Sequence, residues 1–171
     1  MKLRALILAA ALIATGGFGK LALGQGAAVR EVRGPIWTLV PTSAAPLQSI
    51  EVKAPANGNI IVTVTGTMVY EHLLGTEGNY CLQLSTTSGF VGGCVPDGGT
   101  DSAVRSYIAA GVPSTVPGFG ASEQYSIVRT YPVVAGETYT FYLNGFESDL
   151  NNSWLFQPAI TALYVPGTLV P

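Results

Sequence analysis

The side chains that could perform acid–base or nucleophilic catalysis are few in this sequence. His72 is the only histidine, and no serine lies in the Gly-x-Ser-x-Gly turn that exposes the nucleophile of many hydrolases. A serine nucleophile also needs a histidine as its general base. We therefore interpret His72 as a residue at a strand end and a candidate ligand contact. A hydrolase that uses Glu71 and His72 is kept as an alternative.

Metal ligands are also scarce. Zinc generally needs three or four Cys, His or carboxylate ligands, which the sequence lacks once its two cysteines pair. Calcium needs only oxygen ligands, and the segment from Asp97 to Asp101 offers two carboxylates, a hydroxyl and two glycines. Asp97 and Asp101 are therefore candidate calcium ligands, and an acidic turn exposed to water is the alternative. No other cofactor is indicated.

Two pairs of acids could form a glycosidase site only if the fold brought them together. Glu71 and Glu77 flank one loop, and Glu147 and Asp149 lie in another. Such an enzyme needs two carboxyl groups within about 5–10 Å of each other on either side of a sugar bond. We interpret all four as solvated acids, so no catalytic residue is predicted.

Aromatic side chains offer a different chemistry, because an exposed ring can stack on a sugar. We expect Tyr131 and Tyr142 to be exposed and treat them as candidate ligand-binding residues, whereas Trp37 and Phe141 are expected in the core. The wider set of candidate stacking residues is Tyr107, Phe119, Tyr125, Tyr131, Tyr142 and Trp154.

The N-terminus predicts export. Lys2 and Arg4 precede ten uninterrupted apolar residues, a run too short to cross a bilayer about 30 Å thick. A small-x-small site at 22–24 places the predicted cleavage before Gln25, and cleavage near Ala27 or Ala28 is the alternative. The protein is thus expected to be secreted, extracellular or periplasmic, with no membrane span after removal of the signal peptide.

Export sets the expectation for the two cysteines. Cys81 and Cys94 are separated by twelve residues, and in an oxidising compartment such a pair most often forms a disulfide. Closing the loop would contribute about 3 kcal/mol in the chain-entropy account. A reactive thiol or a metal ligand is the competing interpretation.

Length and charge narrow the class of protein. The chain has 171 residues with a net charge of −2, and only 11% of its residues are charged. The predicted signal peptide holds three of the eight cations and none of the ten acids, so the mature net charge would be −5. No basic run is present, which excludes a nucleic-acid binder that works by neutralising phosphates.

Hydrophobic residues alternate with polar ones along most of the mature chain, which is typical of strands with one buried face. The clearest run is 59–70, where Ile60, Val62 and Val64 share a face and Gly66 indicates a bulge or a close backbone approach. The final run contains Pro158, which predicts an edge strand or a bulge. The expected strands are 36–40, 48–53, 59–70, 80–85, 103–109, 124–134, 138–144 and 154–165.

About eight short strands with turn-forming residues between them predict an all-β fold, an antiparallel, jelly-roll-like β-sandwich in a single domain. We expect a signal peptide at 1–24, a flexible lead-in at 25–35 and the sandwich at 36–171. Long loops are expected at 86–101 and 109–122.

Three segments carry a resemblance. Residues 132–143, with an Ala-Gly turn before an aromatic strand, residues 160–166 and residues 60–70 together resemble bacterial secreted jelly-roll domains distantly similar to the C1q/TNF-like group. The chain has no collagen-like stalk, and no functional residue is carried over from that group.

The sequence therefore favours a secreted, non-enzymatic β-sandwich that acts as a structural or interaction module for an unknown protein or glycan. A carbohydrate-binding module with exposed tyrosines and a calcium site is the first alternative, and an unrecognised hydrolase is the second. A homo-oligomer is compatible with this interpretation, because sheet edges and tyrosine-rich faces favour self-association.

Overall fold

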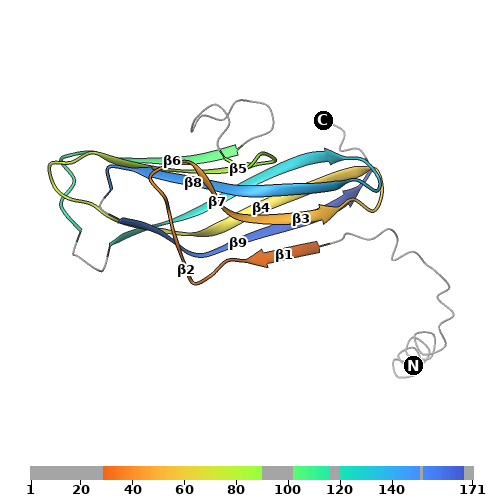
Figure 1. Ribbon diagram of the computed structural model, residues 1–171, viewed down its shortest axis with the longest axis horizontal. Helices are drawn as coiled ribbons and strands as arrows, with labels where there is room; N and C mark the ends of the chain where they lie inside the picture. Colours follow the sequence, from red (N-terminus) through yellow and green to blue (C-terminus); the bar gives the residue numbers. More distant parts are fainter. Residues whose placement is uncertain (1–28, 90–101, 116–119, 151, 168–171) are drawn as a thin grey trace, which may run out of the picture.

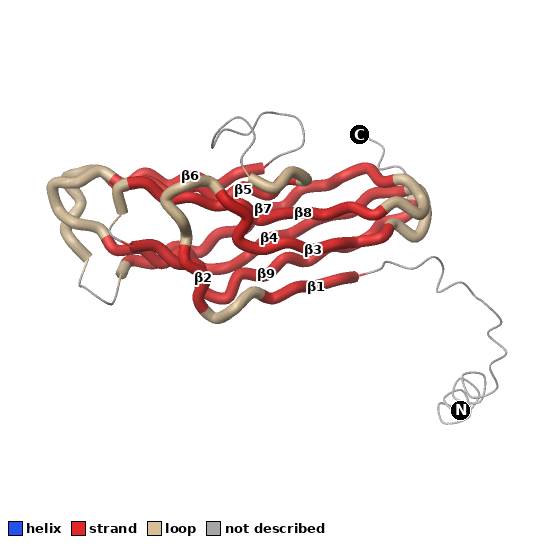
Figure 2. The backbone as a smooth tube through the Cα atoms, viewed as in Figure 1, coloured by secondary structure: helices blue, strands red, loops and turns tan. Residues whose placement is uncertain are grey.

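The computed structural model describes residues 29–89, 102–115, 120–150 and 152–167 (Figure 1). The predicted signal peptide, Cys94 and the candidate calcium ligands Asp97 and Asp101 lie outside these ranges. In the part of the chain that is described, all regular structure is strand (Figure 2). No helix in these ranges is long and apolar enough to cross a membrane.

The strands form two antiparallel sheets that stack as two layers (Figure 1). Sheet A has the order β1-β9-β4-β7, with β2 also paired to β9, and sheet B has the order β3-β8-β5-β6. Each sheet places a late strand between two early ones, as in a jelly roll. The bounds are β1 Val29–Arg33, β2 Trp37–Leu39, β3 Ala45–Lys53, β4 Gly58–Glu71, β5 Gly78–Ser85, β6 Ser102–Ile108, β7 Ala121–Val133, β8 Thr138–Ser148 and β9 Asn152–Pro166. The predicted all-β sandwich is confirmed.

The core lies between the sheets and is built mainly from alternate residues of strands β3 to β9. In β4, Ile60, Val62 and Val64 are fully buried, together with Met68, as their shared face predicted. Branched and aromatic side chains fill the pleated inner surface and exclude water from it. Tyr80, Leu82 and Leu84 of β5, in the opposite sheet, contribute to the same core.

The bulge in β9 changes which side chains enter this core. Thr65 of β4 pairs with Ala159 and Thr67 pairs with Phe156, so Gln157 and Pro158 together lie opposite Gly66. An extra residue in one strand reverses its inward and outward alternation. The bulge expected at Gly66 and Pro158 is therefore confirmed, although β9 lies inside sheet A and not at its edge.

The expected flexible lead-in at 25–35 is wrong for residues 29–33, which form β1. This strand pairs antiparallel with β9, from Val29 opposite Leu163 to Arg33 opposite Ala159. The Gln48 side chain donates a 2.9 Å hydrogen bond to the Val32 carbonyl and ties β1 to β3. Local sequence shows only one inward apolar residue here, so pairing with a distant strand decides the structure.

Candidate binding face

The side of sheet A that faces away from the core, here called the outer face of sheet A, is poor in charge. Alternation and register place side chains from β4, β7 and β9 on it in rows across the strands. Its members are Ile61, Thr63, Thr65, Thr67, Val69, Ser122, Gln124, Ser126, Val128, Thr130, Trp154, Phe156, Ala159, Thr161 and Leu163. None of these side chains is ionisable, and the charged residues of the same face, Glu31 and Arg33 of β1 and Glu71 at the end of β4, lie at its margins.

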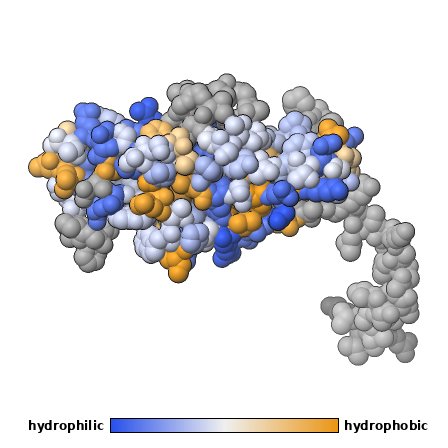
Figure 3. All heavy atoms as spheres, in the orientation of Figure 1, coloured by the Kyte–Doolittle hydropathy of each residue, from blue (hydrophilic) through white to orange (hydrophobic). Residues whose placement is uncertain are grey.

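An aromatic pair stands at one side of this face. The rings of Trp37 and Phe156 have centroids 4.8 Å apart and planes inclined by 52°. Trp37 is 54% exposed, so its predicted place in the core is wrong. The bulge turns Phe156 outward, and Trp37, its register partner in β2, follows it to the outside. Ile36 and Leu39 are also exposed, and Figure 3 shows apolar surface in the region of β2.

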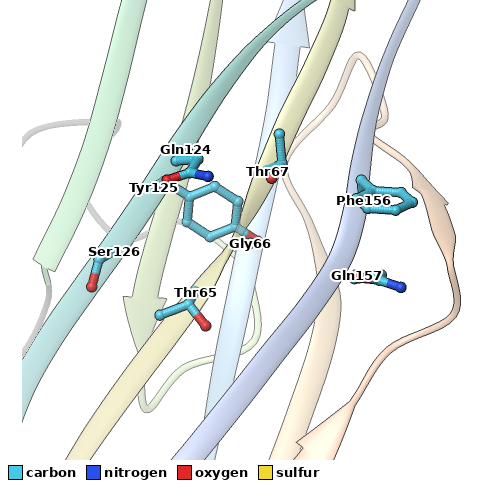
Figure 4. A pocket seen from close by; sticks show the side chains of 8 residues that line it. All are labelled: Thr65, Gly66, Thr67, Gln124, Tyr125, Ser126, Phe156 and Gln157. Atoms are coloured by element: carbon cyan, nitrogen blue, oxygen red, sulfur yellow. The ribbon is translucent and has the colours of Figure 1, made fainter.

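A hollow of about 470 Å³ lies beside the aromatic pair, at the bulge. Figure 4 shows residues from three neighbouring strands around it, namely Thr65, Gly66, Thr67, Gln124, Tyr125, Ser126, Phe156 and Gln157. Gly66 has no side chain, and the Tyr125 ring occupies the space that a Cβ there would need. The hollow is lined by hydroxyl and amide groups, with the Tyr125 ring at Gly66 and the Phe156 ring on its β9 side.

The two candidate ligand-binding tyrosines do not form a platform. Tyr131 is only 5% exposed, because it lies on the inward side of β7, where its ring packs 4.8 Å from that of Phe141. Its expected exposure is therefore wrong. Tyr142 is half-buried on the outer side of β8, in the other sheet. The structure thus separates the two residues.

His72 is buried and holds two loops together. Its Nε2 lies 2.9 Å from the Thr76 carbonyl oxygen, which only accepts, so Nε2–H is the donor. The backbone N–H of Thr115 donates to the His72 carbonyl at 3.0 Å, and the Thr115 hydroxyl accepts from the His72 N–H at 3.0 Å. With 1% of its surface exposed, His72 is a loop anchor in this structure and offers little surface to a ligand.

The fold does not bring the four candidate acids together in the two pairs considered from the sequence. Glu77 and Asp149, one from each predicted pair, line one hollow of about 490 Å³ with Leu150. Glu71 accepts a 3.0 Å hydrogen bond from the Asn152 amide. Glu147 is buried, which raises the pKa of its carboxyl, while a hydrogen bond from the Leu150 N–H opposes that shift. Within the described ranges, no three Cys, His, Asp or Glu side chains could share a metal ion.

Sequence reasoning missed one polar cluster. Glu123 accepts hydrogen bonds from Tyr80, Tyr70 and Ser106, with oxygen–oxygen distances of 2.6, 3.3 and 3.5 Å. Its position in β7 was the available signal, because Glu123 has the same parity as the buried Tyr125 and Ile127. A carboxylate at an inward position needs partners.

Cys81 is fully buried in β5. Since Cys94 lies outside the described residues, the disulfide between them stays a prediction.

Comparisons with known proteins give no family model and no curated protein that matches. Among solved structures, a chain of the Gx strain of infectious bursal disease virus and the VP2 subviral particle of that virus each have a TM-score of 0.43 and 10% identity. Each match covers 81% of this chain, which spans 32% of the viral chain. The Eiger TNF of S. frugiperda has a TM-score of 0.36 and 11% identity, over 82% of this chain and 88% of that one. These values transfer no activity, ligand or partner to this chain.

Proposed function

We propose that this protein is an exported, non-catalytic interaction module that binds a neutral glycan on the outer face of sheet A. The observation that carries the proposal is the Trp37–Phe156 pair beside the hollow of about 470 Å³. An exposed ring offers an apolar surface to the C–H groups of a sugar, and nearby hydroxyls and amides can bond to its hydroxyls.

Charge supports a neutral ligand. The lining of the hollow contains threonine, serine and glutamine side chains and no acid or base other than the Tyr125 phenol. An ionised ligand would find no counter-charge there, whereas a polyhydroxylated ligand would exchange hydrogen bonds with water for similar bonds with protein. The same lining supports a binding role in place of hydrolysis, because it brings no pair of carboxylates to the ligand.

Affinity electrophoresis in gels containing hydroxyethyl cellulose, galactomannan, arabinoxylan or dextran tests the proposal. We expect at least one polysaccharide to retard the protein, and Trp37→Ala to weaken that retardation at least tenfold. Tyr107→Ala is the matched control, because Tyr107 is 56% exposed but lies on β6 of sheet B. Equal retardation of the Trp37→Ala protein would refute this binding site.

Calcium and export can be tested with the same material. We propose that binding does not need calcium, because the hollow is lined by no carboxylate. Loss of retardation in a chelator would instead implicate Asp97 and Asp101. Intact mass of the exported protein should show a chain that begins at Gln25, with Cys81 and Cys94 two hydrogens short of their reduced form.

A further inference from the structure

We infer that the ligand is an extended oligosaccharide that crosses Gln157 and occupies hollows on both sides of it, with Gln157 as the residue that sets its path. This inference rests on the proposed function and adds the length and direction of the ligand. It follows from the shape of the surface at the β9 bulge and from the backbone conformation of one residue.

Two hollows adjoin at this bulge. The second has a volume of about 370 Å³ and lies on the β1 side of β9, where Ile36, Ala159 and Thr161 contribute to its lining. Both hollows are lined by Thr65 and by Gln157. A chain of sugar units running across the strands, from β7 toward β1, would pass from one hollow to the other over these two side chains.

Gln157 holds a conformation that its side chain disfavours. Its φ is 49°, in the left-handed region where glycine is normally found. Its side chain is exposed, so packing in the core does not require a glutamine there. Residues held in sparsely populated backbone conformations cluster at active sites and ligand-binding sites.

The surrounding backbone fixes that conformation. The Gln157 N–H donates a 3.0 Å hydrogen bond to the Ile36 carbonyl, and the Gly34 N–H donates a 2.8 Å bond to the Pro158 carbonyl. A Cβ at Gly34 would lie 2.7 Å from the Pro158 ring, so the β1–β2 connection packs closely on the bulge. The amide of Gln157 is therefore presented from a fixed backbone, which lowers the entropy lost on binding.

The chemistry of the two hollows differs, which gives the ligand a direction. The first holds the Phe156 ring and no charge, whereas Glu31 and Arg33 line the second and form an ion pair with a 2.6 Å Nε–Oε1 distance. We expect a sugar face to stack in the first hollow. In the second, sugar hydroxyls would donate to the Glu31 carboxylate and accept from the Arg33 guanidinium.

Calorimetry with β-1,4-linked gluco- and manno-oligosaccharides of one to six units tests the inference. For wild type, affinity should rise at least tenfold between the monosaccharide and the longest ligand. Gln157→Gly should raise the Tm by about 2–4 °C, because glycine accepts the positive φ, and should remove most of the gain with length. Trp37→Ala should weaken binding at every length.

The outcomes separate the two proposals. If Trp37→Ala weakens binding but Gln157→Gly keeps the full dependence on length, the extended path over Gln157 is wrong and the glycan site stands. If oligosaccharides bind with an affinity that neither variant changes, the site itself is misplaced. If neither these oligosaccharides nor any polysaccharide in the gels binds, both proposals are refuted. A lower Tm for Gln157→Gly would overturn the argument from strain.

Discussion

The Tyr80 hydroxyl of β5 donates a 2.6 Å hydrogen bond to Oε2 of Glu123 on β7, and this bond joins sheet B to sheet A. Oε1 of the same carboxylate accepts from Tyr70 of β4 and from Ser106 of β6. Hydrogen bonds to an ionised acceptor are roughly twice as strong as neutral ones. The cluster therefore fastens the sandwich along the side where β6 and β7, the end strands of the two sheets, meet.

Replacing this carboxylate should loosen the sandwich. Glu123→Ala leaves the buried Tyr80 hydroxyl without its main acceptor, so we expect the free energy of unfolding to fall by about 2–3 kcal/mol. Urea denaturation measures the change. Ser122→Ala, at the exposed neighbouring position, should stay within about 0.5 kcal/mol of wild type. A Glu123→Ala protein as stable as that control would show that the cluster contributes nothing.

Alkaline pH should unfold the protein through its buried tyrosines. Burial is the largest cause that raises the pKa of Tyr80 and Tyr125 well above 10, and Glu123 raises that of Tyr80 further. The fold favours the neutral phenols, so their contribution to stability is complete below pH 10 and is lost as pH rises above it. We expect stability to fall above pH 10. Ultraviolet absorbance should show that Tyr80 and Tyr125 ionise only when the protein unfolds. Tyr125→Phe should reduce this pH dependence.

Gly66 and Tyr125 should behave as a coupled pair. A Cβ at residue 66 would lie 2.6 Å from Oη and 2.9 Å from Cζ of Tyr125. We expect Gly66→Ala to reduce the free energy of unfolding by about 1–3 kcal/mol. Adding Tyr125→Leu should recover part of that loss, which a double-mutant cycle measures. Gly111→Ala is the control, since its Cβ would have no neighbour within 4 Å. If the two changes in the free energy of unfolding simply add, the Tyr125 ring does not depend on Gly66 for its packing.

Asn144 should control the segment that follows β5. Its amide nitrogen donates to the carbonyls of Thr87 and Gly89 at 3.0 and 2.6 Å, and its oxygen accepts from the Gly89 N–H at 3.0 Å. We expect Asn144→Ala to reduce stability by about 2–3 kcal/mol and to speed proteolysis at residues 86–89. Asn79→Ala loses one side-chain bond of 3.4 Å and is the matched control. Similar cleavage rates for both variants would contradict this role.

The local alternation of residues was enough to predict where the strands lie. It was not enough to predict which side of every strand faces the core. The run 59–70 buries Ile60, Val62 and Val64 as expected, because its alternation continues through Gly66 to Tyr70. In β9 the bulge inserts a residue, so Leu155 is buried and Phe156 turns outward. The error at Trp37 has the same origin, because its partner in β9 decides its side.

The binding face depends on information that a single strand does not contain. The uncharged outward positions of β4 and β7 could be identified from alternation. Which of them meet is set by register between strands far apart in the sequence, such as Thr67 between Phe156 and Gln124. The inward position of Glu123 could also be identified from alternation. Its three hydroxyl partners could not, because they come from three other strands.

The position of β9 has a consequence for how the molecule reaches this structure. The fifteen residues from Asn152 to Pro166 pair with β4 on one side and with β1 and β2 on the other. Contacts between segments so distant in the chain form slowly, because a long loop must close first. Until β9 pairs, β4 has no neighbour on that side, and β1 and β2 have no strand of sheet A to pair with. Sheet A is therefore complete only once β9 has paired with β4, β1 and β2.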